Sequence, residues 1–201
     1  MTISLAIDTS TSRTSVAIIE DGALLWHGCR DGATSHGDAL PSLVVEGLKT
    51  QPIIEQVVVG MGPGPFTGLR VGIAFARTFA LARTIPIIGI CSLDAIAALL
   101  VREKDDFIVA TDARRKEIYW ARYQSGVRVE GPSVDFPGHV RAKGISMFGE
   151  GAVKYSFADS DEDQYPDLQA LVAISTDLDA RVDAPLYIRH PDAVPTSERT
   201  K

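Results

Sequence analysis

The sequence predicts an α/β protein of two lobes, each built on a mixed sheet with helices. Two observations support this. The first hundred residues read as three strands followed by alternating helices and strands, and a strand, polar turn and strand recur at 107–123. Asp8 closes the first strand, and Asp112 stands at the corresponding point of the repeat. A chain of 201 residues, 45% of them hydrophobic, can bury an ordinary core in two small lobes.

The opening strands are expected at 3–10, 15–21 and 23–31. Each is rich in β-branched and apolar residues, and a polar turn and Gly22 separate them. Such spacing favours three consecutive antiparallel strands.

A helix is expected at 35–49, because four apolar residues recur there at helical spacing: Leu40, Leu43, Val44 and Leu48. Ser35 or Asp38 can cap its start. Pro41 fits only if it falls in the first turn, since it has no N–H to donate.

The rest of the first lobe alternates strands and helices. We expect strands at 56–62 and 85–91 and helices at 68–83 and 92–101. The predicted lobes are therefore residues 1–104, with the helices that would bind a partner, and a smaller lobe at 105–201. Within the second lobe the pattern weakens to a strand near 144–151, an acidic loop at 158–167 and a short helix at 168–174.

Composition limits the function. The formal charge of -6 argues against electrostatic binding of nucleic acid by this chain alone. The sequence contains neither a run of about 18 apolar residues nor a basic segment ahead of the first strand, so we expect a cytoplasmic protein without membrane contact. Cys29 and Cys91 lack the spacing of a zinc site and are expected to be buried free thiols.

The run GMGPGPFTGLRVG at 60–72 raises the question of phosphate binding. It lacks the Gly-Lys pair of a Walker loop, and its glycine spacing misses the dinucleotide fingerprint. Pro63 and Pro65 remove two N–H donors. We interpret the run as a stiff strand-to-helix connection with Thr67 capping the helix, and anion binding by the amides of 66–69 is the alternative.

Two lobes that each begin with a strand, turn and strand carrying an Asp resemble the actin, sugar-kinase and Hsp70 superfamily, a ribonuclease H-like fold. That superfamily includes phosphotransferases, ATPases and non-catalytic subunits, so the fold alone does not decide the activity.

More specific blocks resemble the TsaB family of tRNA threonylcarbamoyladenosine biosynthesis proteins, also called YeaZ. The blocks are AIDTSTSRTSVAI (6–18), GPGPFTGLRVGIAFARTFALA (62–82), PIIGICSLDAIA (86–97), ATDARRKEIYWARY (110–123) and PLYIRHPDA (185–193). The resemblance covers the first lobe and both ends of the second.

The resemblance implies a non-catalytic accessory subunit. Its expected partner is TsaD, which transfers a threonylcarbamoyl group to an adenosine beside the anticodon. The ATPase TsaE is expected in the same complex. The chain is expected to contact tRNA only as part of that complex. TsaD carries two histidines four residues apart on a helix, where this chain has Ser92 and Ile96. We therefore expect no metal, no cofactor and no catalytic residue of its own.

The expected partner surface comes from the first two helices. Their apolar and small residues suit close helix packing, and two helices from each of two chains would form a four-helix bundle. The predicted interface comprises His36, Leu40, Leu43, Val44, Gly47, Leu69, Gly72, Ala76 and Ala80. A homodimer through the same surface is expected when TsaD is missing. Ala76→Glu or Ala80→Glu would test this placement.

The alternative function is a small-molecule kinase or ATPase that uses Asp8 and Asp112 between the lobes, although turn capping explains both residues as well. A metallopeptidase has no support, because the chain contains no HExxH motif. The basic triplet at 114–116, beside Glu117, is interpreted as an exposed hairpin turn and not as a tRNA groove.

Overall fold

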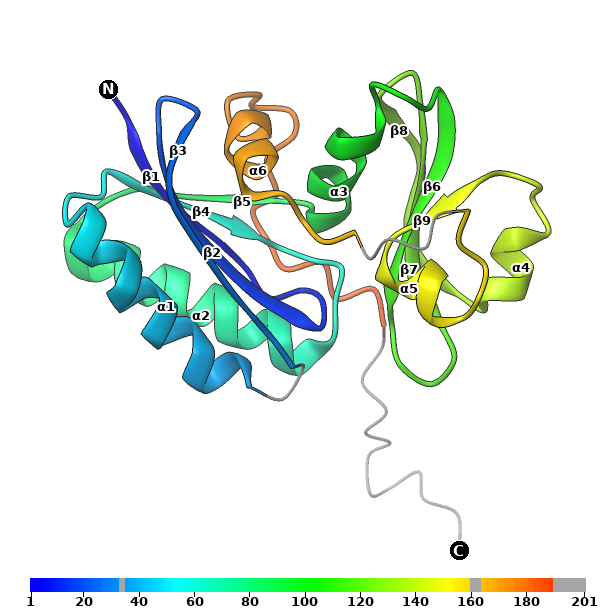
Figure 1. Cartoon of the computed structure of the whole chain (residues 1–201), viewed down its shortest axis with the longest axis horizontal. Helices are drawn as coiled ribbons and strands as arrows, with labels where there is room; N and C mark the ends of the chain where they lie inside the picture. Colours follow the sequence, from blue (N-terminus) through cyan, green and yellow to red (C-terminus); the bar gives the residue numbers. More distant parts are fainter. Residues whose placement is uncertain (33–34, 160–163, 190–201) are drawn as a thin grey trace, which may run out of the picture.

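The computed structural model describes residues 1–32, 35–159 and 164–189. Figure 1 shows two lobes side by side, each with its own twisted sheet. Within the described residues, every helix is too short or too polar to cross a membrane.

The first sheet has five strands in the order β3-β2-β1-β4-β5. The strands are β1 (Ile3–Asp8), β2 (Arg13–Glu20), β3 (Ala23–Asp31), β4 (Gln56–Gly60) and β5 (Ile87–Ile90). β1 pairs antiparallel with β2 and parallel with β4, so the sheet is mixed. The predicted run of three antiparallel strands is confirmed.

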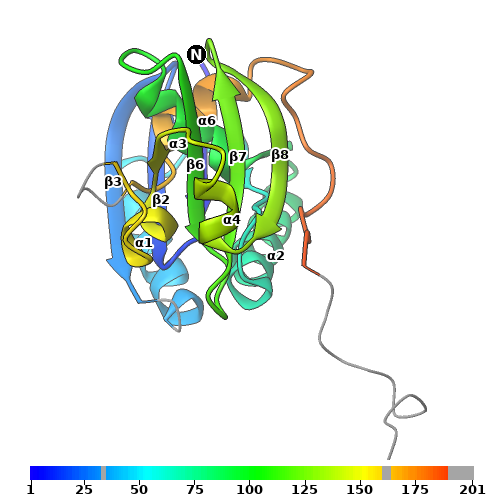
Figure 2. The same cartoon turned by 90° about the vertical axis from the view of Figure 1, so that its right-hand side faces the viewer.

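The second sheet repeats the first with one strand fewer, in the order β8-β7-β6-β9. Its strands are β6 (Asp106–Asp112), β7 (Ile118–Gln124), β8 (Val127–Asp135) and β9 (Met147–Phe148). β6 pairs antiparallel with β7 and parallel with β9, as β1 does with β2 and β4. Figure 2 shows β6, β7 and β8 side by side. The repetition confirms the predicted two-lobed, actin-like architecture.

Helices cover both faces of the first sheet. α1 (His36–Thr50) and α2 (Phe66–Arg83) share one apolar core with the strands on one face. α3 (Ser92–Leu100) and α6 (Leu168–Ile174) lie on the other face. α3 also buries Leu93 and Ile96 against the second sheet, which joins the lobes. Two short helices, α4 (Pro137–Arg141) and α5 (Glu150–Lys154), belong to the second lobe.

α6 returns to the first lobe although it follows the second sheet in sequence. Leu168, Leu171 and Val172 pack with Ala6, Ala17 and Val58. The link between the lobes runs from the end of α3 to the start of β6 at Asp106. The division of the lobes between residues 104 and 105 remains a prediction. Residues 168–174 fall in the predicted second lobe by sequence, but they contact the first sheet. Residues 160–163 of the acidic loop and 190–201, which include part of the last resemblance block, lie outside the described residues.

Two local predictions about helix starts are wrong. Pro41 lies inside α1, beyond the first turn. It deprives the carbonyl of Gly37 of its helical partner, and Gly37 is exposed, so that water can replace the missing donor. α2 begins at Phe66 with Pro65 as its N-cap, and Thr67 lies within the helix and not at its cap.

Candidate functional site

Asp8 ends β1 at the junction of the lobes and is almost fully buried. Its Oδ1 accepts hydrogen bonds from the backbone N–H and the hydroxyl of Ser10, each at 2.8 Å, and its Oδ2 accepts one from the Ser92 hydroxyl at 2.6 Å. Burial raises the pKa of Asp8, and the three donors oppose that rise. Both carboxylate oxygens therefore serve to join the β1–β2 turn to the start of α3.

The glycine-rich run packs directly on the β1–β2 turn. A Cβ at Gly64 would stand 2.3 Å from the carbonyl oxygen of Ser10, and one at Gly68 would stand 2.5 Å from that of Thr9. The Thr9 hydroxyl donates to the carbonyl of Gly68 at 2.8 Å. A Cβ at Gly60 would overlap the Asp8 carboxylate. The glycines thus permit close backbone contact, which is the role expected of a stiff strand-to-helix connection.

The two positions that the resemblance aligns with a histidine pair have other contacts here. Ser92 is fully buried and donates to Asp8, and Ile96 is fully buried in the core between α3 and the second sheet. Across residues 1–32, 35–159 and 164–189, no group of three or more His, Cys, Asp or Glu side chains could hold a metal ion.

Asp112 occupies the equivalent place at the end of β6. Its carboxylate accepts from Lys154 Nζ at 2.5 Å, from the Tyr155 hydroxyl at 3.0 Å and from the Arg114 N–H at 2.9 Å. Burial alone would raise the pKa of Asp112, but these donors outweigh it and lower the pKa. The carboxylate is therefore held ionised within the second lobe.

Glu150, which sequence reasoning missed, connects the lobes. It is the first residue of α5, and it accepts a hydrogen bond from the Ser12 hydroxyl at 2.5 Å. Burial raises the pKa of Glu150; bonds from Ser12 oppose the rise, and nearby Asp112 adds to it. In the sequence, Glu150 is marked only by its place between two glycines after a short apolar stretch.

A cavity of about 290 Å³ opens at this junction. Ser12, Asp112, Arg114, Glu150, Val153, Lys154 and Tyr165 line it. Asp112 lines this cavity, and Asp8 is not among its lining residues.

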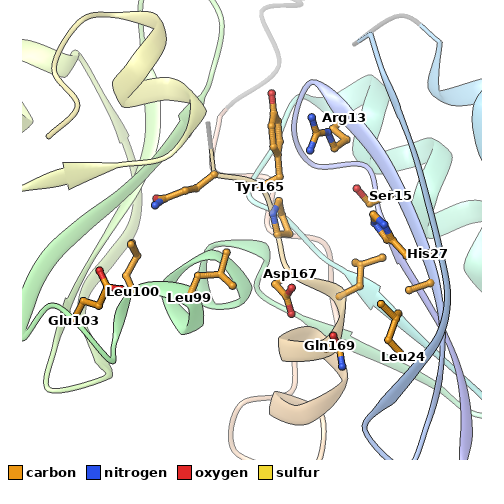
Figure 3. A pocket seen from close by; sticks show the side chains of 14 residues that line it. Arg13, Ser15, Leu24, His27, Leu99, Leu100, Glu103, Tyr165, Asp167 and Gln169 are labelled. Carbon is orange, nitrogen blue, oxygen red and sulfur yellow. The ribbon is translucent and has the colours of Figure 1, made fainter. Parts of the chain in front are cut away.

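A larger cavity, of about 520 Å³, lies between β2, β3, α3 and the segment 164–169 (Figure 3). The Arg13 guanidinium stacks on the Tyr165 ring at 3.8 Å and also pairs with Asp31. The wall mixes both signs of charge with apolar side chains such as Leu24 and Leu99. This mixture does not define one class of ligand.

The nine predicted interface residues lie in the interior of the chain. His36, Leu40, Leu43, Val44, Gly47, Leu69, Gly72, Ala76 and Ala80 are all buried. The apolar ones among them pack against the first sheet, and Gly72 faces Thr9. The Nδ1 of His36 lies 2.7 Å from the Thr14 hydroxyl, and burial lowers the pKa of His36. These residues are not accessible to a partner while the lobe is folded.

The outer faces of α1 and α2 consist of other residues. Val45 on α1 is 57% exposed and Leu81 on α2 is 82% exposed. Ala74 and Thr78, seven and three residues before Leu81 on α2, are exposed as well. A partner that docks on these two helices would meet this surface, called here the outer helical face.

Comparison with known families gives one match that covers most of the chain. The model of a family described as TsaD, tRNA N6-adenosine threonylcarbamoyltransferase, matches residues 33–158. Uncharacterized protein Rv3421c of Mycobacterium tuberculosis is 39% identical over 95% of this chain and 93% of its own length. The tRNA threonylcarbamoyladenosine biosynthesis protein TsaB of Escherichia coli is 37% identical over 60% of this chain.

The matches differ in how much of each relative they cover. The match spans 54% of the Escherichia coli protein, and it spans 57% of uncharacterized protein ML0378 of Mycobacterium leprae, which is 40% identical. Among solved structures, a Pseudomonas aeruginosa protein described as similar to peptidase YEAZ superposes with a TM-score of 0.76 at 26% identity, over 94% of this chain and 100% of its own. YeaZ from the same species gives 0.69 at 25% identity, over 88% and 91%.

Proposed function

This chain belongs to the TsaB/YeaZ family, and from that membership we propose that it is a non-catalytic accessory subunit of the complex that forms threonylcarbamoyladenosine in tRNA. In this proposal it binds the catalytic subunit TsaD and supports the transfer that TsaD performs. The family blocks carry the proposal, since they extend over both lobes.

The lobe junction supports a non-catalytic role. The Asp8 carboxylate already accepts three hydrogen bonds from Ser10 and Ser92. A group that binds phosphate-bound magnesium must offer a free oxygen, and a catalytic site needs several such groups together. In this protein the two Asp8 oxygens instead accept hydrogen bonds that stabilise the fold.

The outer helical face supports docking on TsaD. Small and apolar residues there, among them Val45, Ala74 and Leu81, allow two helices of a partner to approach closely. The resulting contact would be a four-helix bundle. A second copy of this chain would occupy the same face when TsaD is absent.

The remaining partners follow from the same proposal. TsaE would join the complex as its ATPase, and all steps would take place in the cytoplasm. With a net charge of -6, the chain would meet tRNA within the complex and not by itself.

Titration calorimetry of TsaD into this protein tests the proposal. We expect saturable one-to-one heat with a dissociation constant at or below the micromolar range, about 8 kcal/mol. Absence of heat and of co-elution at high concentration would contradict it.

A small-molecule kinase or ATPase remains the second candidate, because Asp112, Lys154 and Arg114 meet at the 290 Å³ cavity. Calorimetry with ATP and magnesium separates the two functions. Micromolar binding that Asp112→Ala abolishes in a protein that stays folded would favour the kinase.

A further inference from the structure

An exposed aromatic pair lies at the N-terminal end of α2. The rings of Phe66 and Tyr187 lie 5.1 Å apart between centroids, and they are 52% and 45% exposed. The guanidinium of Arg70, one turn further along α2, lies 5.1 Å from the centre of the Phe66 ring. Exposed rings beside a guanidinium form a surface on which a planar group can stack.

A basic turn of the second lobe lies beside Arg189, two residues after Tyr187 in the chain. Arg114, Arg115 and Lys116 link β6 to β7, and all three have left-handed backbones, with φ of 63°, 52° and 66°. Three such residues in succession are costly without glycine, at about 1 kcal/mol or more each. All three side chains are exposed.

The last described segment joins the two features. Arg189, two residues after Tyr187, donates to the carbonyl of Ala113 at 2.8 Å and pairs with Glu117 at 2.5 Å. Figure 1 shows this segment running between the start of α2 and the β6–β7 turn. Arg189 thereby neutralises the carboxylate beside the basic turn, so the turn is more positive than its sequence suggests.

These residues form one patch that spans both lobes. The basic aromatic patch comprises Phe66, Arg70, Arg115, Lys116, Tyr187 and Arg189. Beside Arg189, whose charge is offset by Glu117, it carries the three cations Arg70, Arg115 and Lys116 on a chain whose net charge is -6. The first turn of α2 adds partial positive charge, because it contains no acidic residue and no side chain caps it.

We propose that the basic aromatic patch is a contact surface for unpaired nucleotides of the tRNA substrate. The proposal rests on the function proposed above and adds the part of this subunit that touches the RNA. Phe66 and Tyr187 would stack on bases, while Arg70, Arg115 and Lys116 would neutralise phosphates. An acidic protein would use the cations but would have no need of two exposed rings, so the pairing of both chemistries favours RNA.

The test is fluorescence anisotropy of a labelled RNA hairpin with an anticodon stem-loop sequence, titrated with the complex of this protein and TsaD. Two double variants separate the two chemistries. Arg115→Asn with Lys116→Asn removes two charges, and Asn tolerates the left-handed backbone, so the turn still folds. Phe66→Ala with Tyr187→Ala removes the rings.

We expect different effects from the two variants. The charge variant should bind about tenfold more weakly at 50 mM salt and lose about one to two units of the slope of log K against log salt. The ring variant should bind about tenfold more weakly with an unchanged slope.

Matched controls change the same chemistry elsewhere. Arg102→Asn with Lys104→Asn removes two exposed cations from the turn before β6, about 20 Å away along that strand. Phe136→Ala removes a phenyl ring of similar exposure, 49%, in the second lobe. Both controls should leave RNA affinity unchanged.

The remaining outcomes are distinguishable. Wild-type affinity in both double variants would overturn the proposal, as would equal competition by polyglutamate and RNA, which would indicate an acidic protein partner. Loss of TsaD binding in the variants would place the patch in the subunit interface and also overturn it. If wild-type protein fails to bind TsaD, the proposed function fails, and the same titrations on this chain alone at low salt still decide whether the patch holds RNA.

Discussion

The hydroxyl of Ser92 donates a 2.6 Å hydrogen bond to the buried carboxylate of Asp8. This bond joins the end of β1 to the first residue of α3, the helix that contacts both lobes. The same carboxylate also orders the β1–β2 turn through Ser10. Asp8, which would face a nucleotide in a kinase, therefore holds β1, the β1–β2 turn and α3 together in this protein.

Removal of the Asp8 carboxylate should destabilise the fold. Asp8→Ala leaves the buried hydroxyls of Ser10 and Ser92 without their acceptor, and we expect a loss of about 2 to 4 kcal/mol in the free energy of unfolding. Urea denaturation measures this. Asp183→Ala, at an exposed aspartate, should change stability by less than about 0.5 kcal/mol. Equal stability of both variants would contradict the assigned role of Asp8.

The glycine-rich run predicts a contrast between two Gly→Ala variants. Gly64→Ala puts a Cβ 2.3 Å from the Ser10 carbonyl oxygen, so the backbone must shift, at a cost of about 1 to 3 kcal/mol. Gly37→Ala meets no atom within 4 Å and lies in α1, so it should stabilise by about 0.5 to 1 kcal/mol. Thermal unfolding compares them. A neutral Gly64→Ala would mean that the turn does not require the glycine.

Glu150 gives a pH dependence of known sign. Burial raises its pKa in the folded protein, so the folded state binds more protons than the unfolded state above pH 4.5, and stability falls as pH rises through the folded pKa. Asp112 acts oppositely, since its pKa is lowered and its contribution is lost as pH falls below 3.8.

Two variants isolate the contribution of Glu150. Glu150→Gln should lose the decline in stability that begins near pH 4.5 in the wild type, as measured by urea denaturation across pH. Ser12→Ala removes a donor to the carboxylate and should extend the decline to higher pH. Parallel curves for all three proteins would show that Glu150 titrates alike in both states.

The outer helical face predicts a specific binding defect. Leu81→Glu puts a charge on a side chain that is 82% exposed, so the lobe should fold normally. Burial of that unpaired carboxylate against TsaD should cost about 3 kcal/mol, or roughly a hundredfold in affinity. Leu178→Glu, at a leucine that is 71% exposed on another segment, is the matched control. Calorimetry that gives equal TsaD affinities for both variants would move the interface elsewhere.

The sequence predicted the first lobe well because its elements have strong, local patterns. The strands at 3–8 and 23–31 are found within two residues of their predicted ends. β8 escaped prediction because Gly131 and Pro132 interrupt it and it lies at the edge of its sheet.

The burial of the predicted interface residues has a separate physical reason. Helical periodicity identifies the most apolar face of a helix, and in α1 and α2 that face packs on the chain's own sheet. Ala76→Glu and Ala80→Glu would therefore bury a carboxylate in the core, since these alanines are at most 3% exposed. Contacts between distant segments, such as Ser12 with Glu150, leave no periodic signal at all.

The most direct test of the central claim is the amount of threonylcarbamoyladenosine formed in tRNA by a reconstituted system that contains TsaD, with this protein present or omitted. We predict that product forms only when the protein is present and that Leu81→Glu reduces it while Leu178→Glu does not. Full product formation without the protein would contradict its role as a required accessory subunit.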